Sequence, residues 1–522
     1  ADGRVPERGA GRLFRAYRPP APVAGNPAAG GSFFPAEQHR APDSEDDMSA
    51  SPTVLVIIVT WNKKAYVVDL LQSLQRLSYP AERLYVAVVD NASSDGTAEV
   101  LKRDFPDIHV IENSENLGGT GGFNTGLRYA FAQPEGKYDY LWLLDNDVQV
   151  HRNALTELVT LLETEPDAAV AGSTMMQLTT PWRINEMGAF VDLHRGRLLL
   201  NRHREDVPGL EGNTLEELHN MDIDLSDNLE DCRPSMDVEY IAAASLLIRS
   251  RIAREAGLWD DYFIHYDDVE WCLRIARMGH RILVSACSLI WHLPAEYKVP
   301  TWILYYDNRN VQYLLEKHAP ENVRGLRRWI RKKSLYYMLL GKNDLARLHL
   351  EALEDYRQRK TGKKDIVLDG CYFPPAHVQE LLHNDGVRRV LIPWTVDLVK
   401  SGLHDIVAAA MKKRSDLRVD CLVAPPFVED GMKCLLDGTD SVQVSAGKGR
   451  RWFNYVKMYN HYDLVFQSDY QPILPLNLAA EKILYVNYEG VSLRHRPTTK
   501  NIVRSIRSIG ANGAVMAVNG KI

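Results

Sequence analysis

Residues 54–63 have the sequence VLVIIVTWNK, in which six consecutive apolar residues are followed by a polar end. A short apolar run bounded by polar residues is typical of a buried strand. Apolar residues at helical spacing follow, at Val67, Leu70, Leu71, Leu74 and Leu77. Further strand-like runs at 84–89, 109–112 and 138–144 alternate with helical patterns at about 97–103 and from about 124. This βαβαβ alternation predicts an α/β, Rossmann-like domain whose parallel sheet binds ligands at the carboxyl ends of its strands.

The composition is that of an ordinary globular protein, with 45% hydrophobic and 25% charged residues among 522, enough for two or three domains. The formal net charge of −6 gives no support to a nucleic-acid role, which needs a concentrated basic surface. The six cysteines are widely spaced without a C-x-x-C pair, which favours a reducing cytoplasm over a zinc site or a disulfide framework. No apolar run approaches the roughly 20 residues that a membrane-spanning helix needs.

Changes in composition divide the chain into four expected segments. Residues 1–52 are rich in Ala, Gly, Pro and Arg without apolar periodicity, and we expect a disordered leader there. A domain carrying the chemistry is expected at 53–300, a helical, basic segment at 301–385, and a second Rossmann-like α/β domain at 386–522. The second domain contains no G-x-G-x-x-G or Walker A sequence, so its ligand stays open.

Basic residues are concentrated between 324 and 340, where they are interleaved with Leu326, Trp329, Ile330 and Tyr336. A helix of this kind can lie on an anionic membrane surface, as a peripheral contact on the inner face of the cell membrane. The competing interpretation is a solvated basic face on a packed helix. Both stay open at the level of sequence.

The strongest local signal is Leu143-Leu144-Asp145-Asn146-Asp147, where two carboxylates separated by one residue follow an apolar strand. Alternate strand residues point the same way, so both carboxylates can face one ligand. Hard divalent cations take oxygen ligands, and Mg²⁺ is usually held by one or two carboxylates plus substrate phosphates. The pattern therefore predicts a divalent metal site, with a solvated turn as the alternative.

A glycine-rich run, Asn116-Leu117-Gly118-Gly119-Thr120-Gly121-Gly122, precedes a helical pattern at 123–131. Glycines let the backbone approach a ligand closely, and a helix N-terminus favours anions. We expect a loop placed beside an anionic ligand rather than a flexible turn.

Two further segments carry candidate chemistry. Asp267 and Asp268 lie within an aromatic sequence, FIHYDDVEW at 263–271, and adjacent carboxylates in such surroundings favour a raised pKa in one of them, as suits a general base. The competing account is an Asp-rich helix N-terminus, where acids offset the macrodipole. His292 follows the apolar stretch 282–290, and a lone histidine is more often structural than a ligand.

The order of these segments resembles that of the family-2 glycosyltransferases, which have a GT-A fold. The similarity is greatest to bacterial galactofuranosyltransferases of galactan synthesis and covers about residues 53–360. It rests on six segments: Thr60-Trp61-Asn62-Lys63, Val89-Asp90-Asn91, Asn116-Leu117-Gly118-Gly119, Asp145-x-Asp147, Asp267-Asp268 and Trp291-His292.

The resemblance implies a metal-dependent, inverting transfer of a sugar from a nucleotide diphosphate. By it, Asp145, Asp147 and His292 would coordinate Mn²⁺ or Mg²⁺, and Asp268 would be the catalytic base with Asp267 beside it. Asp90 would contact the uracil or thymine base, and Lys63 would lie near the nucleotide. The full set implied for the donor is Thr60, Asn62, Lys63, Asp90, Asn116, Gly118, Gly119 and Asn146.

The sequence departs from the family pattern at two places. Asn146 stands where those relatives have a third Asp, and Tyr240-Ile241-Ala242-Ala243-Ala244 stands where the galactan polymerases have paired Trp residues. The first departure keeps the two outer metal ligands. The second leaves acceptor recognition open, within the expected class of cell-surface polysaccharides or lipid-linked glycans.

Alternatives stay open for the donor and for the class of protein. UDP-galactofuranose is expected because of the double Gly-Gly loop, whereas rhamnosyltransferases of the same family use dTDP-rhamnose. The alternative from another class is a non-catalytic glycan-binding scaffold with a decayed GT-A domain. The presence of Asp145, Asp147, Asp268 and His292 argues against it. The second α/β domain is interpreted as the first half of a GT-B-like transferase or as an accessory domain, and the oligomeric state is open.

Overall fold

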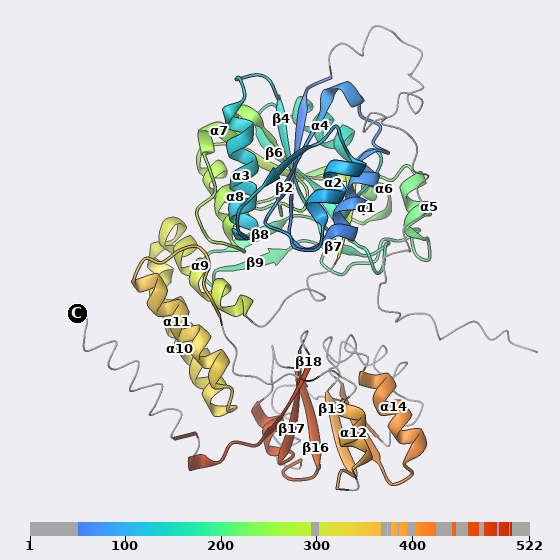
Figure 1. Cartoon of the computed structure of the whole chain (residues 1–522), viewed down its shortest axis with the longest axis vertical. Coiled ribbons are helices and arrows are strands. Elements are labelled where there is room, and N and C mark those ends of the chain that lie inside the picture. The colour runs from blue at the N-terminus through green and yellow to red at the C-terminus, as the bar shows by residue number, and fades with distance from the viewer. Residues whose placement is uncertain are drawn as a thin grey trace, which may run out of the picture.

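The computed structural model describes residues 51–293 and 302–366 without gaps. Beyond these it describes residue 373 and the segments 377–384, 386–393, 403–423, 441–444, 458–468, 474–487, 490–500 and 502–503. The leader expected at 1–52 lies outside the described residues except for its last two. Figure 1 shows an N-terminal α/β domain, a helical segment and a second α/β domain. None of the helices within these ranges is long and apolar enough to cross a membrane.

A mixed sheet forms the centre of the N-terminal domain, with strands in the order β10-β12-β6-β11-β4-β1-β2-β3, β5 beside β12 and β7 beside β6. Their bounds are β1 Val54–Thr60, β2 Leu84–Asp90, β3 His109–Glu112, β4 Tyr140–Asp145, β5 Val148–Val150, β6 Ala168–Gln177, β7 Ile184–Glu186, β10 Ser235–Asp237, β11 Leu246–Arg249 and β12 Arg281–His292. The pairs β1–β2, β1–β4 and β2–β3 are parallel, as the βαβαβ pattern predicts. The sheet differs from the expected parallel one at β11, which is antiparallel to both β4 and β6.

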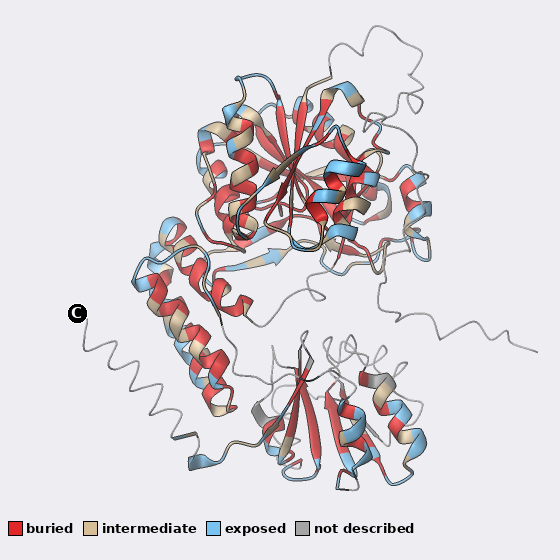
Figure 2. Ribbon diagram, viewed as in Figure 1, coloured by how far each residue is buried: buried red, intermediate tan, exposed pale blue. Residues whose placement is uncertain are grey.

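Both faces of this sheet are covered by helices. Alternate residues of β1 enter opposite cores: Val56 packs with α1 (Lys64–Leu74) and α4 (Ala154–Thr164), and Ile57 packs with α3 (Gly118–Ala132) and α8 (Asp267–Arg277). A strand buried on both faces appears in sequence as an unbroken apolar run, which explains VLVIIV. Figure 2 shows the central strands of this sheet largely buried, under helices that are exposed on their outer sides. The remaining helices of this domain are α2 Thr97–Asp104, α5 Leu215–Asn220, α6 Leu225–Asn228 and α7 Ser250–Ala256.

The glycine-rich run forms the first turn of a helix, which corrects the expectation of a loop followed by a helix from about residue 124. The helix α3 begins at Gly118, and four of its first five residues are glycines. Glycine is among the poorest helix formers, so propensity alone places the start too late. Tertiary contacts of this turn, described below, outweigh that propensity.

Three helices, α9 (Ile303–His318), α10 (Val323–Leu339) and α11 (Asn343–Arg357), follow the N-terminal domain. α10 and α11 pack along each other, and α11 also packs on α9. Phe263 shares a core with Tyr305 and Tyr306 of α9, so this helix packs against the segment that precedes α8.

The second domain contains a six-stranded sheet in the order β15-β14-β13-β16-β17-β18, parallel except for β18. Its elements are α12 His377–His383, β13 Arg389–Pro393, α14 Leu403–Lys413, β14 Arg418–Val423, β15 Ser441–Val444, β16 Leu464–Ser468, β17 Lys482–Asn487 and β18 Gly490–His495. Val378 and Leu382 of α12 belong to the same core as β13 and β16. The short 3-10 helix Leu474–Leu478 contacts the turn between α10 and α11, where Asn477 Nδ2 donates to the Leu340 carbonyl at 3.4 Å. The expected boundaries at 52, 300 and 385 stay predictions.

Candidate active site

Three candidate metal ligands meet where β4 and β12 end. Asp145 is the last residue of β4, and His292 is the last residue of β12. Asp147 directly precedes β5, whose Val148 pairs with His292 in an antiparallel register. This short pairing of β5 with β12 brings Asp147 beside His292, although the two residues lie far apart in the chain.

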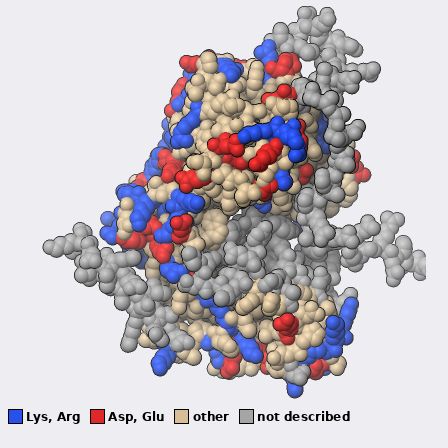
Figure 3. All heavy atoms as spheres, in the orientation of Figure 1, with Lys and Arg blue, Asp and Glu red and all other residues tan. Residues whose placement is uncertain are grey.

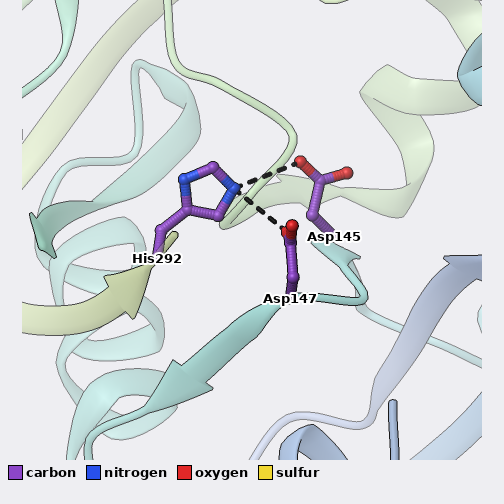
Figure 4. A group of neighbouring side chains, drawn as sticks. All are labelled: Asp145, Asp147 and His292. Carbon is purple, nitrogen blue, oxygen red and sulfur yellow. Dashed lines mark ion pairs between the residues drawn. The ribbon is translucent and has the colours of Figure 1, made fainter. Parts of the chain in front are cut away.

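The side chains of Asp145, Asp147 and His292 converge on one point (Figure 4). His292 Nε2 lies 3.2 Å from Asp147 Oδ1 and 3.8 Å from Asp145 Oδ2, and one ligand atom from each residue lies within 4.8 Å of the other two. Asp147 and His292 are buried, whereas the Asp145 side chain is 44% exposed. Two carboxylate oxygens and one imidazole nitrogen, open to solvent on one side, fit a divalent transition metal such as Mn²⁺.

The loops that follow β1, β2 and β4 are joined by hydrogen bonds between candidate donor-binding residues. Asn146 Nδ2 donates to Thr60 Oγ1 at 3.0 Å, and Thr60 is paired with Asp90 across the parallel strands. Asp90 is buried, and its carboxylate accepts a hydrogen bond from the Ser93 amide. Thr60, Asp90 and Asn146 therefore lie together at the carboxyl edge of the sheet, beside Asp145.

Asn62 and Lys63 lie where β1 passes into α1. Asn62 has a positive φ of 50° and donates its backbone N–H to Ser93 Oγ at 2.8 Å, while its side-chain oxygen accepts from the Ser94 amide at 2.7 Å. Lys63 Nζ lies 5.0 Å from the centre of the Tyr66 ring. The loop after β1 is thus fixed to the loop after β2, on the same edge as Asp90.

The glycine-rich turn packs against the segment that leads to the acidic pair. Gly118 has a φ of +73°, and a Cβ there would lie 2.0 Å from the Phe263 carbonyl oxygen. Asn116 Oδ1 accepts from the Gly118 amide at 2.8 Å, and the Thr120 amide donates to the Phe263 carbonyl at 3.2 Å. A Cβ on Gly119 would instead meet no atom within 4 Å. Gly118 therefore permits a close contact within the protein, and Gly119 is the glycine with open space beside it.

Asp267 and Asp268 begin helix α8 but have different partners. Asp268 Oδ2 accepts a hydrogen bond from Tyr240 Oη at 2.9 Å and a longer one from the Ala243 amide at 3.3 Å. Burial and the neighbouring Asp267 carboxylate raise the pKa of Asp268 to about 7. Asp267 is buried and accepts from Thr120 Oγ1, so its carboxyl group joins α8 to α3.

Two residues near Asp268 could not be identified from the sequence. Tyr240 lies in the segment that differs from the galactan polymerases, and the position of that segment in the motif order was the only available signal. Glu186, the last residue of β7, is buried, and burial together with the Asp268 charge raises its pKa to about 8. No local pattern distinguishes Glu186, because its proximity to Asp268 arises only from the fold.

The segment before α8 has an unusual backbone held by α9. Phe263, His265 and Tyr266 have φ values of 70°, 64° and 67°, which non-glycine residues adopt at a cost. Asn310 Nδ2 donates to the carbonyls of residues 262, 264 and 265 at 3.1, 2.7 and 3.0 Å. His265 Nδ1 lies 2.7 Å from Asp307 Oδ1. Helix α9 thereby fixes the conformation from which Asp268 projects.

Residues 55–211 match the family model described as glycosyl transferase family 2. Together with the mixed α/β sheet, this match confirms the predicted GT-A fold class and enzyme class: the chain carries a glycosyltransferase domain of family 2.

Among curated proteins, the galactofuranosyltransferase GlfT2 of Mycolicibacterium smegmatis is 23% identical over 316 residues, covering 58% of this chain and 47% of the relative. GlfT2 of Mycobacterium tuberculosis is 22% identical over 324 residues, covering 58% and 48%. The low-salt glycan biosynthesis hexosyltransferase Agl10 of Haloferax volcanii is 25% identical over 249 residues, covering 47% and 66%. The predicted similarity to galactofuranosyltransferases is confirmed, and the chain spans about half the length of the two GlfT2 proteins.

Among solved structures, the chain matches the mannosyltransferase PcManGT from Pyrobaculum calidifontis in complex with GDP-Man and Mn²⁺. It is 17% identical with a TM-score of 0.34, covering 72% of this chain and 90% of that one. GalNAc-T7 with UDP, GalNAc and Mn²⁺ is 16% identical with a TM-score of 0.38, covering 59% and 55%.

Proposed function

We propose that this protein is a metal-dependent, inverting glycosyltransferase that moves galactofuranose from UDP-galactofuranose onto a cell-surface polysaccharide or lipid-linked glycan. The observation that carries the proposal is the convergence of Asp145, Asp147 and His292 at the sheet edge that also bears Asp90. The family match and the similarity to galactofuranosyltransferases support the choice of reaction and donor.

In this proposal Asp145, Asp147 and His292 hold Mn²⁺ or Mg²⁺, and the imidazole nitrogen favours Mn²⁺ over the oxygen-preferring Mg²⁺. When bound, the ion would act as a Lewis acid that offsets negative charge on the leaving nucleotide diphosphate. The donor is held by loops at the same edge. The residues proposed to contact it are Thr60, Asn62, Lys63, Asp90, Asn116, Gly119 and Asn146, with Gly118 allowing the turn to close.

Asp268 is the proposed catalytic base, with Asp267 beside it as a structural partner. Its carboxylate takes the proton of the acceptor hydroxyl while the hydroxyl oxygen bonds to the anomeric carbon and the bond from that carbon to the diphosphate oxygen breaks. One displacement inverts the configuration. The hydrogen bond from Tyr240 orients one oxygen of Asp268 and leaves the carboxylate partly accessible.

A donor-selection experiment tests this proposal. The protein is incubated with Mn²⁺ and UDP-galactofuranose, UDP-galactopyranose or dTDP-rhamnose in separate reactions, and nucleotide release is measured. We expect release from UDP-galactofuranose alone, and its loss on chelation of the metal. Turnover of dTDP-rhamnose alone would reassign the donor, and no release from any nucleotide sugar would favour a glycan-binding scaffold.

The variant Asp147→Asn tests the proposed metal site. Asp147 is the buried carboxylate closest to His292, so its loss removes a ligand while a similar volume remains. We expect nucleotide release to fall by at least the factor of 10²–10⁴ typical of losing a catalytic group. The stabilisation of the wild type by added Mn²⁺, about 2.7 kcal/mol at 100 times the Kd, should disappear as well.

A further inference from the structure

Helix α10 has a charge pattern opposite to that of the whole chain. Its 17 residues, VRGLRRWIRKKSLYYML, contain six Lys or Arg residues and no Asp or Glu, whereas the chain carries a formal net charge of −6. A local concentration of positive charge attracts anionic partners.

The packing of α10 divides its residues into two faces. Leu326, Ile330 and Tyr337 are buried against the neighbouring helices. Arg324, Arg328 and Lys332 follow one another at intervals of four residues on the exposed side, together with Arg331. The same side exposes Trp329 (51%) and Leu335 (46%). Cations and large apolar side chains therefore share one outward surface of the helix.

The cations of α10 differ from those of the surrounding helices in their partners. Among the described residues, no ion pair joins any of the six to a carboxylate. On α11 and just beyond it, by contrast, Arg347 pairs with Glu351, Arg357 with Glu354, and Arg359 with Glu316. Figure 3 shows the same interspersion of acidic and basic side chains on the face that it draws. Among the described residues, the six cations of α10 thus lie outside ion-pairing distance of any carboxylate.

We propose that the outer face of α10 docks on an anionic lipid membrane. Anionic lipid headgroups complement the four exposed cations, while Trp329 and Leu335 can enter the boundary between headgroups and acyl chains. Lys333 Nζ lies 5.6 Å from the Trp329 ring centre, so a cation and an amphipathic ring are presented together. A soluble polyanion would use the cations but would gain little from the exposed indole and leucine. The proposal concerns this surface alone and is independent of the donor and acceptor proposed above.

Co-sedimentation of the full chain with vesicles tests the charge component. We expect binding to phosphatidylcholine vesicles that contain phosphatidylglycerol, and little binding to phosphatidylcholine alone. The triple variant Arg328→Gln, Arg331→Gln, Lys332→Gln should bind roughly 100-fold more weakly, since each cation near an anionic surface contributes about a fivefold change in affinity. The matched control Arg347→Gln, Arg357→Gln, Arg359→Gln removes the same formal charge from paired positions and should bind as the wild type does. Circular dichroism checks that both variants are folded.

A second pair of variants separates a membrane from a soluble polyanion. At high salt, where electrostatic attraction is screened and the apolar contact contributes more of the binding, Trp329→Ala should weaken vesicle binding several-fold. The control Phe190→Ala changes another exposed aromatic residue (45%) and should not weaken it. Equal vesicle binding by wild type and the α10 triple variant would overturn the proposal. The proposal would also be overturned if Trp329→Ala bound vesicles like the wild type and heparin displaced the protein from the vesicles. That result would assign the surface to a soluble polyanion.

Discussion

Asp267 and Asp268 are neighbours in the chain, but their carboxyl groups have different surroundings. Asp267 is enclosed and accepts a hydrogen bond from Thr120, whereas Asp268 is only partly buried and is oriented by Tyr240. Burial raises the pKa of both, and the presence of two carboxyl groups side by side adds to the shift at Asp268. The helix N-terminus is observed, because α8 begins at Asp267, and the raised pKa of Asp268 is compatible with the general base proposed above.

The pKa of about 7 at Asp268 gives a prediction with a definite sign. The proposed base must be deprotonated, so kcat/KM should rise with pH through about 7, and the bound metal should move the midpoint lower by offsetting the Asp145 charge. Because the folded-state pKa lies above the ordinary 3.8, the folded protein binds more protons than the unfolded chain between those values. The Asp268 carboxyl group thus lowers the free energy of unfolding as pH rises through this window.

The variant Asp268→Asn checks both consequences. In the presence of a metal chelator, its free energy of unfolding at pH 8 should exceed that of the wild type by on the order of 1 kcal/mol. This difference should disappear near pH 4, and denaturant unfolding measures it at both pH values. Its nucleotide release should fall by about 10²–10⁴ and lose the rise near pH 7. Wild-type turnover in Asp268→Asn would show that another group is the base.

The sequence predicted these site residues unevenly, for physical reasons. Asp145 and Asp147 follow an apolar strand, and a strand end in an α/β sheet has few possible environments. His292 became a candidate only through its place in the motif order, since its neighbour Asp147 is supplied by the pairing of β5 with β12. Glu186 approaches Asp268 from a segment with no characteristic spacing, and the segment of Tyr240 is marked only by its place in the motif order.

At the scale of elements, the strands were predicted well and their order was not. Apolar runs such as 54–59 and 84–89 appear as β1 and β2, because burial on both faces leaves few alternatives. The insertion of antiparallel β11 between β4 and β6 depends on chain connections that a single sequence does not specify. The start of α3 was placed too late because helix propensity does not reflect tertiary contacts: Gly122 leaves room for Val59, and Gly118 leaves room for Phe263.

This contact gives a prediction for the first turn of α3. Gly118→Ala would place a Cβ against the Phe263 backbone at a positive φ, so we expect a loss of about 1–3 kcal/mol in stability and a displaced α8. Gly119→Ala meets open space within a helix and should be neutral or stabilise by about 0.4–1 kcal/mol. Thermal unfolding of the two variants measures the difference. Equal stability would mean that the turn is not in contact with residue 263 in solution.

At the scale of the whole molecule, the second domain meets the turn between α10 and α11 through buried charge. Lys342 is fully buried with its Nζ 4.2 Å from the Tyr485 ring centre, and burial lowers its pKa to about 7. Arg494 of β18 lies 3.3 Å from the Asp344 carboxylate, whose side chain is 1% exposed. A buried carboxylate that loses its partner is costly, so this contact depends on Arg494.

The variant Arg494→Met should therefore loosen the second domain. We expect a destabilisation of about 1–2 kcal/mol, reduced from the cost of a fully buried pair because Arg494 is 25% exposed, visible as faster hydrogen exchange in β17 and β18. Arg388→Met removes an exposed pair with Asp416 at 4.0 Å and should change little. Nucleotide release should be unchanged in both, since these residues lie outside the N-terminal domain. Unchanged exchange in Arg494→Met would show that the ion pair does not hold the domain in place.

The interleaved sheet of the N-terminal domain has a practical consequence. The exposed turn at Gly209 and Gly212 separates a first fragment, which carries Asp145 and Asp147, from a second, which carries Asp268 and His292. Because β11 of the second fragment lies between β4 and β6 of the first, neither fragment can complete the sheet alone. If the chain is cut at this turn, we expect the two separate fragments to be inactive and their reassembled complex to be active. Fused to two other proteins, the pieces would serve as a split-enzyme reporter of their association.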